Sequence, residues 1–135
     1  MNSRLKTVRR GLAVLLIAYW LAMFVATHVP RVPQQLSLMP GGDKSQHLIA
    51  YAGLAFLIGI RQSVGDSLGR KRAMFVFGIV ALYGVIDELT QIPVGRTADV
   101  NDWLADVTGA GAGLGLQTAL RATLSRRAES RRGSA

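Results

Sequence analysis

The chain alternates between long apolar blocks and short polar stretches. Almost every charged residue lies between or beyond the blocks, which span Gly11 to Thr27, Leu48 to Ile60, Ala73 to Ile86 and Trp103 to Leu120. A helix crosses a hydrocarbon core of about 30 Å with roughly twenty residues, and its backbone groups must be bonded internally there. The pattern therefore predicts an all-α polytopic membrane protein built as a four-helix transmembrane bundle.

The second and third blocks are too short to cross the membrane alone. They hold thirteen and fourteen residues, which corresponds to about 20 Å of helix. Completing these two spans draws in the polar residues that flank them, Asp43, Lys44 and His47 in one case and Asp87, Glu88 and Gln91 in the other. A buried helical hairpin of a soluble protein would also explain short blocks, but the distribution of charge favours a membrane protein.

Basic residues fall on alternate sides of the predicted spans. Thirteen of the sixteen Lys and Arg residues lie before the first block, between the second and third, or after the fourth. The exceptions are Arg31, Lys44 and Arg96. Because cytoplasmic segments of membrane proteins are enriched in Lys and Arg, both termini are expected in the cytoplasm and the protein in the inner (plasma) membrane. The net charge of +8 is typical of nucleic-acid binders, but this distribution predicts no nucleic-acid partner.

Three segments follow from this topology. Residues 1–10 form a basic cytoplasmic N-terminus, residues 11–124 the membrane domain, and residues 125–135 a basic, flexible cytoplasmic tail. The first block has a basic flank like a signal peptide, but it runs about seventeen residues without a clear small-x-small cleavage site, so we interpret it as a retained anchor. The sequence contains no cysteine, so it predicts neither a disulfide nor thiol chemistry.

Polar residues on three of the predicted helices share a face. At 100° per residue, each set falls on one arc of its helix, and the loop residues Arg96 and Asp99 can close over them. Ionisable groups near hydrocarbon normally face an interior or a water-filled cavity, which predicts a polar pocket on the extracytoplasmic side. The sets are Asp43, Lys44, His47 and Tyr51; Asp87, Glu88 and Gln91; and Asp102, Asp106, Gly109, Gly113 and Gln117.

The fourth block also contains GAGAGLG, residues 109–115. It supplies two overlapping Gly-x-x-x-Gly pairs, Gly109 with Gly113 and Gly111 with Gly115. Small residues at this spacing let helix backbones approach closely in a membrane. We expect this contact within one bundle, in preference to a seam between two copies of the chain.

The predicted pocket admits several kinds of chemistry. His47, Glu88 and Asp87 are candidate catalytic residues, and Lys44 and Arg96 can hold a phosphate or carboxylate. His47 with carboxylates can ligate a divalent cation, but no tight ligand motif is present, so the sequence identifies neither a metal nor another cofactor. In a purely structural reading, Asp43 and either Asp99 or Asp102 are helix caps. The predicted ligand-binding residues are Asp43, Lys44, His47, Tyr51, Asp87, Glu88, Gln91, Arg96, Asp102 and Asp106.

Two stretches resemble the signatures of VanZ-like membrane proteins. DKSQHLIAYAGLAFL (43–57) is similar to their D-K-x-x-H-x-x-x-Y segment, and YGVIDELTQIPVGRTADVNDWLADVTGAGAG (83–113) is similar to their D-E-x-x-Q segment with its following Gly-Arg, acidic motif and Gly-rich helix. THVP (27–30) resembles the end of their first helix. The resemblance implies these signature positions: Asp43, Lys44, His47, Tyr51, Asp87, Glu88, Gln91, Arg96, Asp102 and Gly109. Asp106 departs from it, because Asn often stands there in the family.

The resemblance implies a cell-envelope protein but supplies no general biochemical activity. The founding member is linked to teicoplanin resistance, which we do not transfer to this chain. The favoured function is binding of an envelope lipid or lipid-linked headgroup, with membrane lipids as partners. Two alternatives stay open: a membrane hydrolase or transferase acting on an ester or phosphoester, and a small proton- or cation-coupled transporter. The sequence does not determine the oligomeric state.

Overall fold

The computed structural model describes residues 3–28 and 42–133. Over these residues the chain is helical and contains no strand, which confirms the predicted all-α class. The elements are α1 (Ser3–Thr27), α2 (Gly42–Gln62), α3 (Arg70–Gln91), a short 3-10 helix η2 (Ile92–Val94) and α4 (Val100–Gly133).

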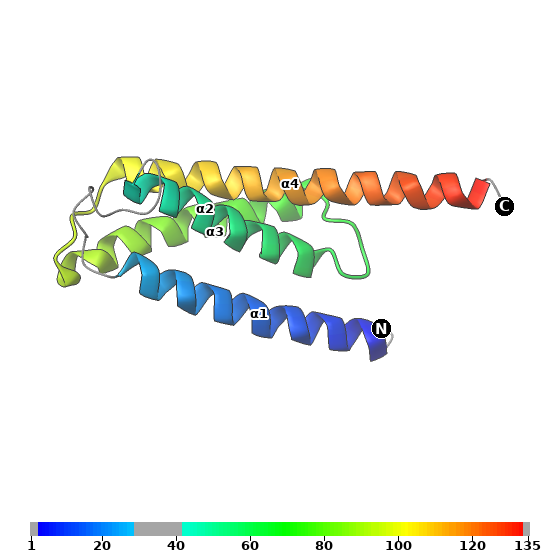
Figure 1. The fold of residues 1–135 in the computed structure, drawn as a ribbon, viewed down its shortest axis with the longest axis horizontal. Helices are drawn as coiled ribbons and strands as arrows, with labels where there is room; N and C mark the ends of the chain where they lie inside the picture. Colours follow the sequence, from blue (N-terminus) through cyan, green and yellow to red (C-terminus); the bar gives the residue numbers. More distant parts are fainter. Residues whose placement is uncertain (1–2, 29–41, 134–135) are drawn as a thin grey trace.

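Successive helices lie side by side and run in opposite directions (Figure 1). Both termini therefore lie at one end of the bundle, which we call the terminal end, together with the connection between α2 and α3. The opposite end, the distal end, carries the start of α2, the end of α3 and the start of α4. α2 packs most extensively against α4, and α1 lies along α2 and α3 with fewer contacts.

Two of the described helical segments are long and apolar enough to cross a membrane. They are α1 (Ser3–Thr27) and α3 extended by η2 (Arg70–Val94). Only 11% of the α1 window and 28% of the α3 window are buried, whereas the core helix of a soluble protein would be mostly buried. Apolar side chains on both helices face outward, for example Val14 at 69% and Phe75 at 69% exposure.

The interior of the bundle is unusually polar. Ten polar or charged residues of the described chain are buried, compared with eight hydrophobic ones, and many large hydrophobic side chains are exposed. Soluble proteins bury mainly apolar residues. A polar interior with an apolar exterior suits a lipid environment, where charged groups turn inward. With the two apolar helices, this distribution indicates a membrane protein.

Glycines allow α2 and α4 to meet backbone against backbone. A Cβ atom added at Gly109 would lie 2.2 Å from the carbonyl oxygen of Leu48, and one at Gly113 would lie 2.1 Å from that of Ala52. No side chain fits at either position. A Cβ at Gly115 would meet nothing within 4 Å. The first Gly-x-x-x-Gly pair thus packs within the bundle, as predicted.

The chain between α3 and α4 is shaped by two residues with special backbones. Pro93 lies in η2, where its missing N–H cannot continue the α-helical bonding. Gly95 then adopts φ +79°, a left-handed conformation that favours glycine, and its N–H bonds to the carbonyl of Ile92. The turn directs the next residue, Arg96, back over the distal end, where its N–H donates to the Gln91 carbonyl at 3.2 Å.

Helix ends differ in places from the sequence interpretation. α1 begins at Ser3 and α4 continues to Gly133, so the described parts of the predicted terminal segments are helical. The last part of α4 is rich in Arg and Ala, good helix formers, and contains no proline. The domain boundaries themselves stay predictions. Arg31 and the last two residues of the THVP stretch, Val29 and Pro30, lie outside the described residues.

Candidate functional site

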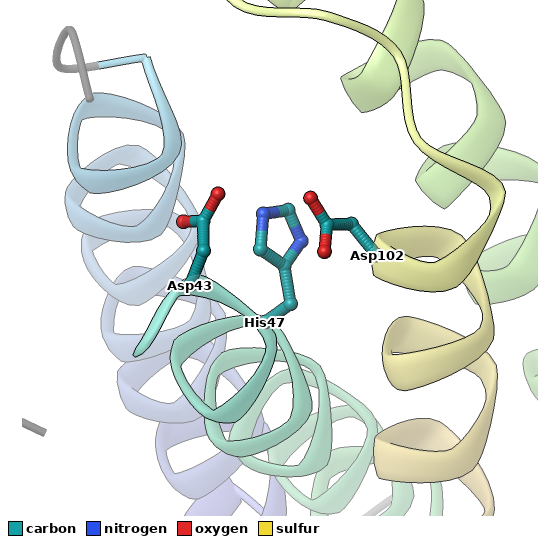
Figure 2. A group of neighbouring side chains, drawn as sticks. All are labelled: Asp43, His47 and Asp102. Atoms are coloured by element: carbon teal, nitrogen blue, oxygen red, sulfur yellow. The ribbon is translucent and has the colours of Figure 1, made fainter. Parts of the chain in front are cut away.

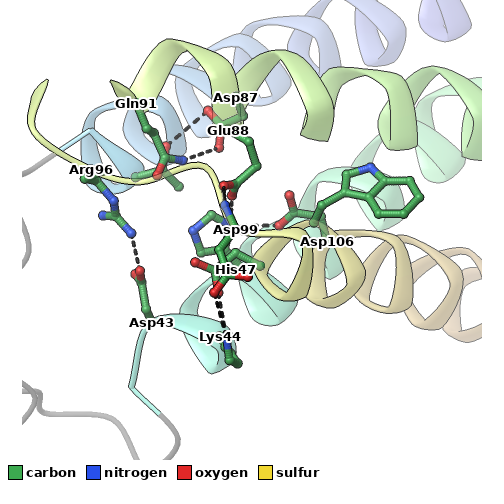
Figure 3. Close-up of polar contacts among 12 residues, drawn as sticks. Asp43, Lys44, His47, Asp87, Glu88, Gln91, Arg96, Asp99 and Asp106 are labelled. Carbon is green, nitrogen blue, oxygen red and sulfur yellow. Dashed lines mark hydrogen bonds and ion pairs between the residues drawn. The ribbon is translucent and has the colours of Figure 1, made fainter. Parts of the chain in front are cut away.

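The predicted ligand-binding residues converge at the distal end of the bundle. Figure 2 shows Asp43, His47 and Asp102 pointing toward one another, and Figure 3 shows the wider set with its contacts. Asp43 and Lys44 are partly exposed, with side-chain exposures of 26% and 53%. The fully or nearly buried members are His47, Tyr51, Asp87, Glu88, Gln91, Arg96, Asp102 and Asp106. Their predicted role in ligand binding stays a prediction.

His47 of α2 is fixed by Asp106 of α4. The imidazole Nδ1 lies 2.8 Å from Asp106 Oδ1, and both side chains are buried. Glu88 Oε1 is farther away, at 3.9 Å from the same nitrogen. We assign the proton of this pair to Nδ1, because an ionised carboxylate only accepts hydrogen bonds. The other ring nitrogen, Nε2, is then an acceptor, and it has no partner among the described residues.

Ion pairs join the first turn of α2 to the α3–α4 connection and to α4. Arg96 Nη2 donates to Asp43 Oδ2. Lys44 Nζ lies 3.2 Å from Asp102 Oδ1 and 3.3 Å from Asp99 Oδ2. α2 begins at Gly42, so Asp43 lies inside the first turn of its helix and does not precede it as a cap. These pairs hold the rim of the distal end together.

Asp99 caps α4. Its Oδ1 accepts a hydrogen bond from the backbone N–H of Asn101 at 2.9 Å, while its own N–H donates to Glu88 Oε2 at 2.8 Å. Bonds from the backbone and side chain of Asn101, followed by Lys44, lower the pKa of the Asp99 carboxyl. Of the two caps proposed for this helix, Asp99 is therefore the one observed, and Asp102 lies in the first turn.

Asp87 of α3 is hydrogen-bonded to α1, a contact that the polar faces of the other three helices do not predict. Its Oδ1 accepts from Thr27 Oγ1 at 3.3 Å, and its Oδ2 accepts from Gln91 Nε2 at 3.2 Å. His28 Nδ1 lies 3.9 Å from Asp87 Oδ1. A single Thr at the end of an apolar block carries no periodic signal. The sequence signal for Thr27 is its place in the THVP stretch.

Several buried polar atoms at the distal end have no hydrogen-bond partner among the described residues. They belong to three helices: Tyr51 Oη, Tyr83 Oη, Glu88 Oε1, Asp106 Oδ2 and His47 Nε2. Buried polar groups are normally paired, and leaving one unpaired costs free energy. Five such atoms at one end of the bundle are the arrangement expected of a site that accepts a polar ligand or water. Gln117 Oε1 and Arg61 Nε, also buried and without a partner among the described residues, lie toward the other end.

Negative charge dominates this end of the described chain. Six carboxylates, those of Asp43, Asp87, Glu88, Asp99, Asp102 and Asp106, face two cations, Lys44 and Arg96. With His47 neutral, the formal charge is four negative. Such a surplus in a largely buried place favours bound cations or shared protons.

An apolar groove of about 310 Å³ lies between α1, α2 and α3, beside the buried polar residues of the distal end, which we call the polar cluster. Aromatic rings connect the groove to the polar residues of the distal end. Tyr83 lines the groove, and its ring centroid lies 6.0 Å from that of Tyr51. The Tyr51 centroid lies 6.4 Å from that of His47. The sequence interpretation did not identify the groove or Tyr83. Its walls are Leu16, Ile17, Trp20, Leu54, Ile58, Ile79, Val80 and Tyr83.

Gln117 shares the α4 stripe with Asp106 but lies apart from the candidate site. It is eleven residues farther along the helix, about 16 Å at 1.5 Å per residue. Its Nε2 donates to Ser63 Oγ at 2.9 Å near the terminal end, and Arg121 Nη1 donates to the backbone carbonyls of Ser63 and Asp66. The buried stripe of α4 thus serves two separate polar clusters.

Two groups of side chains at the distal end have metal-ligand composition. One comprises Asp43, His47 and Asp102, and the other His47, Glu88 and Asp106. In each group, one potential ligand atom per residue lies within 4.8 Å of the others. Nitrogen from His with carboxylate oxygen is a common ligand set for Zn²⁺ and related cations.

Comparison with known proteins gives a match along most of the chain. A family model described as VanZ/LLP1 matches residues 6–121. The match includes all but the first three residues of α1, the whole of α2 and α3, and the part of α4 that lines the candidate site. No curated protein and no solved structure matches the chain.

Proposed function

This chain belongs to the VanZ/LLP1 family, and from that premise we propose that it is a four-span protein of the cell envelope whose distal end binds the headgroup of an envelope lipid. The protein lies in the inner membrane in this proposal, with both termini in the cytoplasm. The basic residues of the termini and of the α2–α3 connection support this orientation, because they gather at the terminal end.

The observation that carries the proposal is the adjacency of the apolar groove and the polar cluster. The groove suits a hydrocarbon chain, and the polar cluster beside it suits a headgroup. The aromatic contact between Tyr83 and Tyr51 joins the two parts. A ligand that is apolar along its length and polar at one end fits both, and membrane lipids have this chemistry.

Charge narrows the class of headgroup. A bare anion is disfavoured where carboxylates outnumber cations. A headgroup that carries donors or positive charge is compatible with the carboxylates, as is a phosphate bridged to them by a cation. Tyr51 Oη and Glu88 Oε1 supply a donor and an acceptor without a partner among the described residues.

The test is mass spectrometry of the lipids that remain bound after gentle purification in detergent. Ile79→Trp fills the groove, whereas Leu82→Trp places the same ring on an exposed position of the same helix that does not line the groove. We expect retained lipid to fall by about tenfold or more in the first variant, equivalent to about 1.4 kcal/mol of affinity, and to be unchanged in the second. Equal retention in both variants would refute the groove as the binding site.

A second candidate, a membrane hydrolase or transferase, is favoured by the His47–Asp106 pair. With Nδ1 held by the carboxylate, Nε2 is positioned to accept a proton from an attacking water or hydroxyl. In this case His47→Gln abolishes release of a lipid-derived product while bound lipid is retained. Product release that is the same in the wild-type protein and in His47→Gln would eliminate His47 as the base.

A further inference from the structure

We propose that the distal end holds one divalent transition-metal cation, ligated by His47 Nε2 and by the carboxylates of Asp43 and Asp102. Asp106 is a positioning residue that orients the imidazole through Nδ1. The three ligands come from the start of α2 and the start of α4, so the cation would clamp the two most extensively packed helices at their distal ends.

The three side chains already lie close together. Their potential ligand atoms lie within 4.8 Å of one another, and Figure 2 shows the imidazole ring between the two carboxylates. Asp43 and His47 are four residues apart on α2, which places both on the same side of the helix. Asp102 approaches from the facing helix.

The imidazole supplies an independent reason to expect a ligand. His47 is only 1% exposed, and its Nε2 has no hydrogen-bond partner among the described residues. Because the Nδ1–H of His47 donates to Asp106 and the proton stays on Nδ1, Nε2 presents a lone pair toward the site. Metal-binding His residues commonly donate their other ring N–H to a carboxylate, which fixes the ring and makes the free nitrogen more basic.

The second group, His47 with Glu88 and Asp106, is the weaker ligand set. A cation among them would meet the Nδ1 side of the ring, where Asp106 is bonded at 2.8 Å and Glu88 lies at 3.9 Å. Binding there would sacrifice the hydrogen bond that orients the ring and leave Nε2 unused. The first group keeps that bond and uses the nitrogen without a partner.

The ion pairs of the two carboxylates do not exclude a metal. Arg96 contacts Asp43 through Oδ2, and Lys44 contacts Asp102 through Oδ1. Each carboxylate has two oxygens and about four lone-pair sites, so it can accept a cationic side chain and ligate a metal together. One divalent cation would also halve the formal surplus of four negative charges at this end.

One imidazole nitrogen with two carboxylate oxygens suits Zn²⁺, Mn²⁺ or Co²⁺, since Mg²⁺ and Ca²⁺ prefer oxygen alone. Three protein ligands leave at least one coordination position open. If the proposed function holds, a phosphate of the lipid headgroup would fill it. That last step rests on the proposed function, whereas the metal site itself does not.

The experiment uses the full chain, purified in detergent from buffers free of added lipid. Metal content is measured by inductively coupled plasma mass spectrometry, and the metal-free protein is titrated with Zn²⁺, Mn²⁺ and Co²⁺. We expect about one equivalent of metal, a rise in Tm on binding, and visible Co²⁺ absorption typical of nitrogen and oxygen ligands. His47→Ala and Asp102→Asn should remove all three signals.

Two further variants make the test graded. Asp106→Asn keeps an oxygen that can accept from Nδ1 but removes the charge, so metal affinity should fall by roughly 10- to 100-fold without being lost. Asp66→Asn removes an exposed carboxylate at the other end and serves as the matched control, with affinity unchanged. Asp102→Asn still tests the site if His47→Ala does not fold.

A wild-type protein that binds none of the three metals and shows no Tm shift would overturn the proposal. So would metal binding that survives both His47→Ala and Asp102→Asn, because the ligands would then lie elsewhere. The metal is assayed alone, so its outcome is independent of lipid retention. Loss of lipid in Ile79→Trp with normal Co²⁺ absorption separates the groove from the metal site.

Discussion

The two ends of the bundle bury polar residues in different ways. At the terminal end, Gln117 bonds to Ser63, and Arg121 donates to two backbone carbonyls of the α2–α3 connection. Asp66, an exposed carboxylate at this end, is paired with Arg72. At the distal end, carboxylates outnumber cations. Buried atoms without a partner among the described residues occur at both ends, for example Gln117 Oε1 at the terminal end and Glu88 Oε1 at the distal end.

The difference lies in charge balance, because both ends are polar. Donors that meet carbonyls or single carboxylates hold helices together without leaving a net charge behind. Carboxylates brought close to one another repel, and that cost remains unless a ligand, proton or cation offsets it. We therefore interpret the terminal-end contacts as structural and the distal-end cluster as the binding region.

The largest loss of stability is expected from a substitution in the α2–α4 contact, on which both ends of the bundle depend. Gly109→Ala places a Cβ atom against the Leu48 carbonyl oxygen in the α2–α4 seam, and backbone atoms cannot move aside without separating the helices. We expect the free energy of unfolding to fall by about 2–3 kcal/mol, measured by denaturant titration in mixed micelles. Lipid retention at the distal end should fall as well.

Gly115→Ala is the control for the seam, because its Cβ would meet nothing within 4 Å. It should unfold at the wild-type denaturant concentration or slightly above, since Ala favours helix over Gly. If Gly109→Ala were as stable as Gly115→Ala, the close approach of α2 and α4 at Gly109 would be wrong. The two ends would then not depend on that contact.

Intermediate changes in stability, of opposite sign, are expected for substitutions at the two ends. Glu88→Gln removes one of the crowded negative charges and keeps an oxygen for the Asp99 N–H, so the metal-free protein should become more stable by up to about 1 kcal/mol. Gln117→Leu removes the bond to Ser63 and should lower stability by about 1 kcal/mol. Chemical unfolding of the metal-free proteins measures both.

Equal destabilisation by both substitutions would remove the contrast between the ends. Unchanged lipid retention in Gln117→Leu is the accompanying expectation, because that residue lies away from the groove. The same lipid measurement on Glu88→Gln shows whether this carboxylate contacts the headgroup. Loss of bound lipid in Glu88→Gln, with normal lipid retention in Gln117→Leu, would assign the headgroup to the distal end.

The smallest effect concerns pH at the terminal end. The Arg72 hydrogen bond, followed by the Ser67 N–H, lowers the pKa of the Asp66 carboxyl below its ordinary value of 3.8. A carboxylate with a lowered folded-state pKa contributes stability above its unfolded value and loses it as pH falls through the folded value. We expect Tm to decline slightly below about pH 4, and Asp66→Asn to lack that component. An identical decline in the variant would contradict it.

Local periodicity allowed much of the site to be predicted. Each residue of a helix is rotated by about 100° from the one before it, so residues four apart lie on the same face. The sequence was therefore enough to place His47 on one face with Tyr51, and Asp102 on one face with Asp106. Apolar blocks predicted the four helices for a different reason, because backbone groups within a membrane must be bonded internally.

Only the tertiary structure decided what each face meets. Axial offset and packing between helices pair His47 with Asp106, bring Thr27 to Asp87 and place Ser63 against Gln117. The apolar groove belongs to three helices at once. Spacing along one helix contains no information on the position of the next, so contacts and the groove emerge only when the close approach at Gly109 and its partners fixes how the helices lie.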